Sequence, residues 1–87
     1  MKISKQKREK ISEQILSFLY HSHPNSKFTA DIAREIARDE EFIKSLMLEL
    51  HGKGLVIDIR KNKDGIKYIR RIRWRLSNNA YSAYKSL

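Results

Sequence analysis

The sequence predicts an α+β fold in which three helices are followed by a two-stranded antiparallel hairpin and a short last helix. Apolar residues recur at helical spacing as far as Leu50, and between Leu55 and Leu76 the period changes to two. An Asp-Gly pair, a favoured hairpin turn, lies inside this alternating stretch. Because 87 residues fill one small domain, we expect residues 1–87 to form a single unit, with disorder expected at residues 1–4.

The first helix is expected from about Ser4 to Tyr20, before a polar loop that contains Pro24. Its buried stripe, at helical spacing, consists of Ile11, Ile15, Phe18 and Leu19. Leu16 and Tyr20 fall outside this stripe and indicate a second apolar surface.

Residues 27–56 predict two short helices joined by a tight bend and followed by a strand. Thr29 suits the N-cap of the first helix, and Asp39 suits the N-cap of the second. The apolar positions of the second helix form one stripe: Phe42, Ile43, Leu46, Met47 and Leu50. Gly52 and Gly54 are expected to end that helix, because glycine takes the left-handed conformation easily.

The spacing of Ala33, Ala37, Ile43 and Leu46 resembles the helix-turn-helix of DNA-binding proteins. Residues 53–56 resemble the exit into the first wing strand of the winged-helix subclass. In that family the bend residue is usually glycine, whereas this chain has Ala37, and alanine is strained in the left-handed region. We therefore expect the bend at Arg38 or Asp39, or a different turn type. An ordinary helical hairpin is the alternative interpretation.

The return strand of the hairpin is expected from Ile66 to Leu76, with Trp74 and Leu76 anchoring it to the helices. Ser77 and the two asparagines after it offer caps for a last helix over residues 78–87. The stretch from Trp74 onward resembles the exit from the wing in many archaeal and bacterial winged-helix regulators. Two roles stay open for the last helix: packing on its own domain, or forming a dimer seam. The candidate dimer residues are Leu16, Tyr20, Tyr81, Tyr84 and Leu87.

The net charge of +9 is unevenly distributed. Residues 60–75 carry a net charge of +7 and residues 1–10 carry +4, whereas residues 11–59 carry −3. Such an excess predicts a polyanionic partner or a membrane surface. A membrane role is not expected, because the cations lie on a predicted hairpin and not on an amphipathic helix.

The resemblance implies that the second helix of the pair enters the major groove while the wing contacts phosphates. The candidate DNA-binding residues of that helix are Glu40, Glu41, Lys44, Ser45 and Leu48. Those of the wing are Arg60, Lys61, Lys63, Lys67, Arg71, Arg73 and Arg75. Those of an N-terminal arm are Lys5, Lys7 and Arg8. Because carboxylates repel phosphates, two interpretations stay open: the helix reads bases with Lys44 and Ser45, or the wing carries the binding.

The sequence therefore predicts sequence-specific or architectural binding of double-stranded DNA by a transcriptional regulator, with a homodimer as a candidate assembly. An RNA-binding module and a protein-docking module are the alternatives. No catalytic motif, cysteine, cofactor motif or metal-ligand set is present, and His21 and His23 are expected to be solvated loop residues. With no apolar segment long enough for a membrane span or a signal peptide, we expect a cytoplasmic protein, associated with the nucleoid if prokaryotic.

Overall fold

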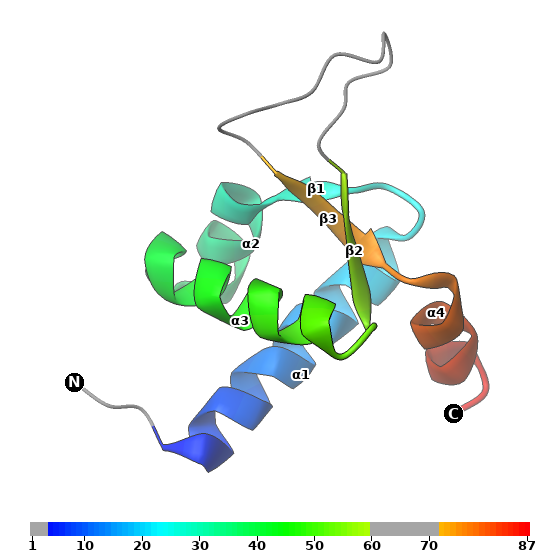
Figure 1. Ribbon diagram of the computed structural model, residues 1–87, viewed down its shortest axis with the longest axis horizontal. Coiled ribbons are helices and arrows are strands. Elements are labelled where there is room, and N and C mark those ends of the chain that lie inside the picture. Colours follow the sequence, from blue (N-terminus) through cyan, green and yellow to red (C-terminus); the bar gives the residue numbers. More distant parts are fainter. Residues whose placement is uncertain (1–3, 60–71) are drawn as a thin grey trace, which may run out of the picture.

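The computed structural model describes residues 4–59 and 72–87, in which four helices pack with a three-stranded sheet (Figure 1). The elements, in chain order, are α1 (Lys5–Ser22), β1 (Lys27–Phe28), α2 (Thr29–Ile36), α3 (Glu40–Gly52), β2 (Val56–Ile59), β3 (Arg73–Leu76) and α4 (Asn78–Lys85). The predicted α+β class and the order of the helices are confirmed.

The helix α1 begins after Ser4, whose hydroxyl oxygen accepts a hydrogen bond from the Lys7 amide at 3.2 Å. Ser4 is thus an ordered N-cap, contrary to the expectation of disorder at this residue, and the helix runs two residues beyond the predicted end. Leu16 was expected outside the buried stripe, but it is only 8% exposed and belongs to the core. The stripe is wider than predicted because α1 packs against α2, α3 and β3 together.

The bend between α2 and α3 lies at Ala37, which takes the left-handed conformation with φ 61°. The prediction of a bend at Arg38 or Asp39 is therefore wrong. The amide of Arg38 donates to the Ala33 carbonyl oxygen at 3.0 Å and the amide of Ala37 donates to the Arg34 carbonyl oxygen at 3.3 Å. These bonds close the end of α2 and offset the strain of a non-glycine residue at this position.

The N-cap of α2 also differs from the prediction: it is Phe28, and Thr29 is the first helical residue. The Asp31 carboxylate accepts from the Phe28 amide at 3.2 Å. The hydroxyl oxygen of Thr29 instead accepts from the indole N–H of Trp74 at 2.8 Å. The side chain predicted as a helix cap therefore joins the helix to the sheet.

The helix α3 follows its prediction closely. The Asp39 carboxylate caps it by accepting from the Phe42 amide at 3.2 Å. The buried residues of α3 are Ile43, Leu46, Met47 and Leu50. Phe42, the remaining member of the predicted stripe, is only partly buried. The helix ends at Gly52, and Gly54 has a φ of 76°.

The sheet has three antiparallel strands in the order β1-β3-β2, where the sequence predicted two. Trp74 of the central strand pairs with Lys27 on one side and with Asp58 on the other. The strand β1 is two residues long, which is too short to show a period of two. Trp74 and Leu76 are 1% and 0% exposed, so both predicted anchors are confirmed. The predicted turn and residues 66–71 of the return strand lie outside the described residues.

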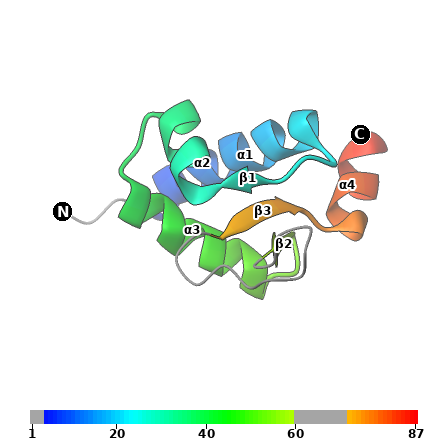
Figure 2. The same ribbon diagram turned by 90° about the horizontal axis from the view of Figure 1, so that it is seen from above.

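The last helix, α4, packs against its own domain at the end of the molecule away from the bend at Ala37 (Figure 2). Tyr20 stacks on Tyr81 and Tyr84, with ring centroids 5.3 Å and 5.7 Å apart. His23 stacks on Tyr81 at 4.0 Å, so its assignment as a solvated loop residue is wrong. The helix ends at Lys85 and not at residue 87.

We expect Ala37→Gly to raise the free energy of unfolding by about 0.5–1 kcal/mol. A left-handed conformation costs an L-residue roughly 1–2 kcal/mol, and the extra freedom of unfolded glycine offsets about 0.4–1 kcal/mol of the relief. Urea denaturation measures the difference. The control is Ala83→Gly in α4, an ordinary helical position, which should lose about 1 kcal/mol. Equal losses in both variants would contradict the strain at Ala37.

Thr29→Val should lower the free energy of unfolding by about 1–3 kcal/mol, because it leaves the buried Trp74 N–H without its acceptor. Thr29→Ser keeps the hydroxyl oxygen and should lose much less. Since Trp74 is the only tryptophan of the chain, its fluorescence during urea denaturation reports the transition directly. If serine and valine are equally destabilising, the hydrogen bond is not the cause.

Candidate nucleic-acid interface

The outer face of α3 is exposed along its whole length. All five residues predicted to contact DNA from this helix lie on it: Glu40, Glu41, Lys44, Ser45 and Leu48. Leu48, near the middle of the helix, lies roughly opposite the buried residues of α3, as the helical period requires. The structure thus brings the predicted helix residues together on one surface.

Two of these side chains differ in what they can still bind. The Ser45 hydroxyl donates to the Phe42 carbonyl oxygen at 2.7 Å, so its proton is already used inside the helix. No hydrogen bond or ion pair in the part of the chain that the structure describes engages Lys44, although Glu40 lies one turn before it. Lys44 is therefore a cation of the α3 surface without an ion-pair partner among the described residues.

The three residues predicted as an N-terminal DNA-binding arm, Lys5, Lys7 and Arg8, lie in the first turns of α1, and their contact with DNA stays a prediction. The Arg8 guanidinium donates to the Glu49 carboxylate of α3 at 2.6 Å and lies 5.6 Å from the centre of the Phe42 ring. The hydrogen bond from Arg8 lowers the pKa of Glu49 below its ordinary value of 4.5. Arg8 therefore fastens α1 to α3, and its charge is matched by a carboxylate.

The far end of α3 is fastened to the sheet. The Nε2 atom of His51 lies 3.1 Å from the Asp58 carboxylate of β2, and its ring meets the Trp74 ring edge-on at 6.2 Å. The last turn of α3 is thus joined to α1 through Glu49 and to the sheet through His51. Residues 60–71 connect β2 and β3.

Five of the seven predicted wing residues, namely Arg60, Lys61, Lys63, Lys67 and Arg71, lie outside the described residues. The other two are half-buried in β3. The Arg73 guanidinium lies 6.0 Å from the centre of the Phe28 ring, and Arg75 donates to the Leu76 carbonyl oxygen at 3.2 Å. Arg73 and Arg75 therefore make contacts within the protein and also carry positive charge.

Comparisons with known proteins identify the architecture. No family model matches the chain, and no curated protein matches it in sequence. Among solved structures, Staphylococcus aureus MepR "in DNA-binding conformation" superimposes with a TM-score of 0.72 and 21% identity, covering 94% of this chain and 61% of MepR. An apo mutant of Lactococcus lactis ZitR gives a TM-score of 0.72 and 20% identity, covering 93% of this chain and 56% of ZitR. The fold is a winged helix.

The predicted winged-helix architecture is thereby confirmed, with α2 and α3 as the helix-turn-helix. MepR is described as a transcription regulator of the multidrug efflux pump MepA, and ZitR as a zinc-responsive MarR family member. At these identities the likeness establishes the fold alone. The chain spans less than two thirds of the length of either protein.

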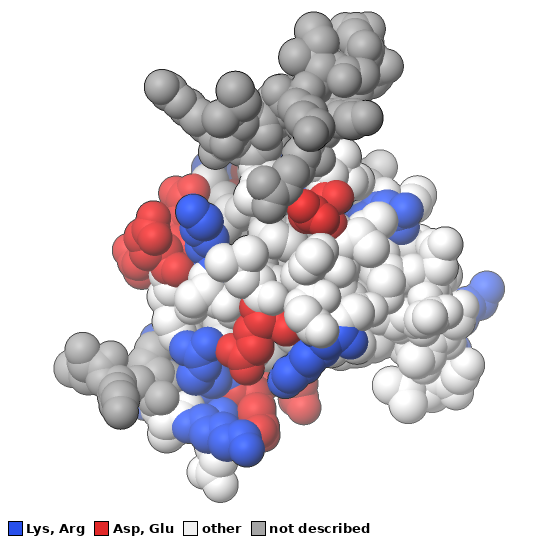
Figure 3. All heavy atoms as spheres, in the orientation of Figure 1, with Lys and Arg blue, Asp and Glu red and all other residues white. Residues whose placement is uncertain are grey.

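Charge is divided unequally between the body of this winged helix and the wing segment, which we define as residues 60–71. Residues 4–59 carry nine cations and nine anions, whereas the wing segment carries six cations and one anion. Figure 3 shows blue and red side chains interspersed over the face that presents α3 and the first turns of α1. The wing segment thus supplies +5 of the net charge of +9, whereas residues 4–59 sum to zero and residues 72–87 carry +3.

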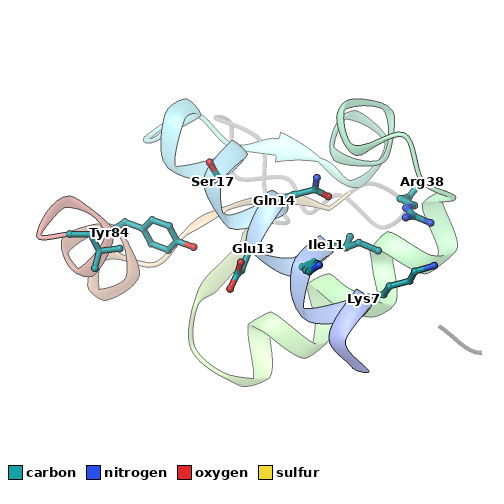
Figure 4. A pocket seen from close by; sticks show the side chains of 9 residues that line it. Lys7, Ile11, Glu13, Gln14, Ser17, Arg38 and Tyr84 are labelled. Carbon is teal, nitrogen blue, oxygen red and sulfur yellow. The ribbon is translucent and has the colours of Figure 1, made fainter. Parts of the chain in front are cut away.

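A groove of about 850 Å³ lies along the solvent side of α1, apart from the outer face of α3. Lys7 and Arg38 lie at one end of it and Tyr84 at the other (Figure 4). Two candidate dimer residues, Tyr84 and Leu87, line this groove. Leu16 is buried in the core of its own chain, so it cannot contribute a dimer surface.

The described residues give no sign of a metal site or a membrane span. No group of three or more His, Cys, Asp or Glu side chains among them is placed to hold a metal ion. No helix within residues 4–59 and 72–87 is both long and apolar enough to cross a membrane.

Arg8→Gln should reduce stability at pH 6 and much less at pH 3. The pKa of Glu49 is lowered in the folded protein, so the pair stabilises fully above the ordinary pKa of 4.5 and loses its effect as the pH falls through the lowered value. The difference in urea midpoint between the wild type and Arg8→Gln should therefore be smaller at pH 3 than at pH 6. Lys53→Gln removes a more distant partner, 3.9 Å from Glu49, and should show a smaller change. A gap independent of pH would contradict the role of the pair.

Proposed function

We propose that this chain binds double-stranded DNA as a transcriptional regulator, with phosphate contacts from the wing segment and base contacts from α3. The observation that carries the proposal is the concentration of six cations in a twelve-residue segment between β2 and β3. These strands adjoin α3, whose outer face is exposed. Each Lys or Arg placed on a phosphate releases condensed counterions, which supplies affinity for any sequence.

The two surfaces are proposed to contribute differently. Residues 4–59 carry balanced charge and expose Glu40 and Glu41 on α3, so this part of the protein adds little attraction for phosphates. The wing segment therefore supplies most of the affinity, and α3 supplies the discrimination between sequences. Because the wing segment and not α3 supplies most of the affinity, carboxylates on α3 are compatible with binding to a polyanion.

A homodimer completes the proposal. The exposed Leu87 and the partly exposed Tyr84 border the groove beside α1, where a second copy would cover apolar surface. Sedimentation equilibrium of the wild-type protein and of Leu87→Ser tests the proposed homodimer. A monomeric wild type would contradict it.

The salt dependence of DNA binding tests the proposed function. If roughly five cations meet phosphates, the slope of log K against log salt on duplex DNA should be about −4 to −5. Replacing Lys61, Lys63 and Lys67 with glutamine should make the slope less steep by about 3 and weaken binding to all sequences alike. Fluorescence anisotropy measures both quantities. The salt concentration is varied between about 50 and 300 mM, a range that spans physiological ionic strength.

The matched control removes three charges elsewhere on the protein. Lys10, Arg34 and Lys85 are exposed on α1, α2 and α4, and their replacement with glutamine gives the same net charge. We expect this control to keep the slope of the wild type. Affinity that does not change with salt, equal losses in the two triple variants, or preference for structured RNA in direct competition would contradict the proposal.

A further inference from the structure

We propose that α3 reads a thymine methyl group with Leu48 and a guanine with Lys44, so that the middle of the helix and not its first turn determines sequence preference. This inference rests on the proposed DNA binding and adds to it the class of base that each side chain recognises. It follows from what surrounds each residue on the outer face of α3.

Leu48 lies near the centre of that face. Successive helical residues are rotated by about 100°, which places Leu48 roughly opposite the buried side of α3. Its side chain is 50% exposed, and the other large apolar side chain exposed to this degree in the described residues is Leu87, at the chain end. A single exposed leucine is common on protein surfaces, so its neighbours must decide what it can do.

Lys44 precedes Leu48 by one turn on the same face. Two cations near α3 are matched by Glu49: Arg8 at 2.6 Å and Lys53 at 3.9 Å. Within residues 4–59 and 72–87 Lys44 has no such partner, so its ammonium group can reach a base without breaking an ion pair there. Guanine offers its O6 and N7 acceptors to lysine in the major groove, and thymine offers its methyl group to an apolar side chain.

Ser45 is a weaker candidate for base readout. Its hydroxyl already donates to the Phe42 carbonyl oxygen at 2.7 Å, so it can only accept a hydrogen bond from a base. Serine contacts are in any case compatible with several bases. Lys44 and Leu48 are therefore the two residues of this face that each favour a particular base.

The first turn of α3 is unsuited to lying against the DNA backbone. Glu40 and Glu41 are exposed there beside Asp39, and three carboxylates repel phosphates more than the helix dipole compensates. We therefore expect the helix to approach the groove with its middle. One turn of helix rises about 5.4 Å and base pairs are about 3.4 Å apart. The guanine and the thymine should therefore lie within about two base pairs of each other.

The test begins with a duplex site selected from a random pool by the wild-type protein. Each thymine of that site is then replaced by deoxyuridine, which removes only the methyl group. At one position this change should weaken wild-type binding roughly fourfold, the effect of removing one buried methyl group. Leu48→Ala should bind the selected site more weakly and should not distinguish thymine from uracil there. Leu48→Met keeps an apolar side chain and should retain the discrimination.

Lys44→Gln provides the second measurement. It should lose the preference for guanine at a position within two base pairs of that thymine, while keeping the thymine discrimination of the wild type. Because both residues are exposed, the variants should fold as the wild type does, which circular dichroism verifies.

The outcomes separate this inference from the proposed function. If the wild type binds DNA with a steep salt dependence but every deoxyuridine site binds equally well, the inference fails and DNA binding stands. The same conclusion follows if Leu48→Ala discriminates as the wild type does, which would place Leu48 in a protein contact. If no duplex DNA is bound at all, both proposals fall.

Discussion

The hydrogen bond from the Trp74 indole to Thr29 is the constraint on which the arrangement of this domain depends. Trp74 lies in the central strand, is 1% exposed and pairs with both neighbouring strands. A buried indole N–H requires an acceptor, and the first residue of α2 supplies it at 2.8 Å. The start of the helix pair is thereby fixed to the sheet. Because the edge of the same ring meets His51 at the end of α3, one side chain positions both helices.

The residue at the bend between α2 and α3 has a strained backbone conformation, which the packing of the two helices stabilises. Ala37 is held at a φ of 61°, where glycine would be relaxed. Ala33, which is 6% exposed, lets α2 and α3 approach closely, and the buried residues of α3 fill the space against α1. The free energy of that packing exceeds the strain at one residue, so tertiary contacts determine the turn. A local preference for glycine was therefore a poor guide to the position of the bend.

The parts of the fold that the sequence revealed are those with a long period or a strong local signal. The stripe of α3, the Asp39 cap and the anchors Trp74 and Leu76 belong to this class. The sequence did not reveal features that depend on residues far apart in the chain. Leu16 is buried because several elements meet α1, β1 is too short to show a period, and Arg8 finds its carboxylate 41 residues away. For the candidate site, periodicity predicted which α3 residues are exposed. Only the structure shows that Lys44 has no ion-pair partner within the described part of the chain and that the Ser45 hydroxyl donates to the Phe42 carbonyl oxygen.

The acidic start of α3 has a consistent place in the proposed function. A regulator must distinguish its site from a large excess of other DNA, so the ratio of specific to non-specific affinity matters more than affinity alone. Cations in the wing segment raise both affinities together, because phosphates are the same at every site. Carboxylates such as Glu40 and Glu41 weaken every complex that brings α3 close to the backbone. In the proposed complex, only a sequence that engages Lys44 and Leu48 would offset that repulsion. An acidic helix combined with a basic wing segment would therefore favour selectivity at a moderate loss of affinity.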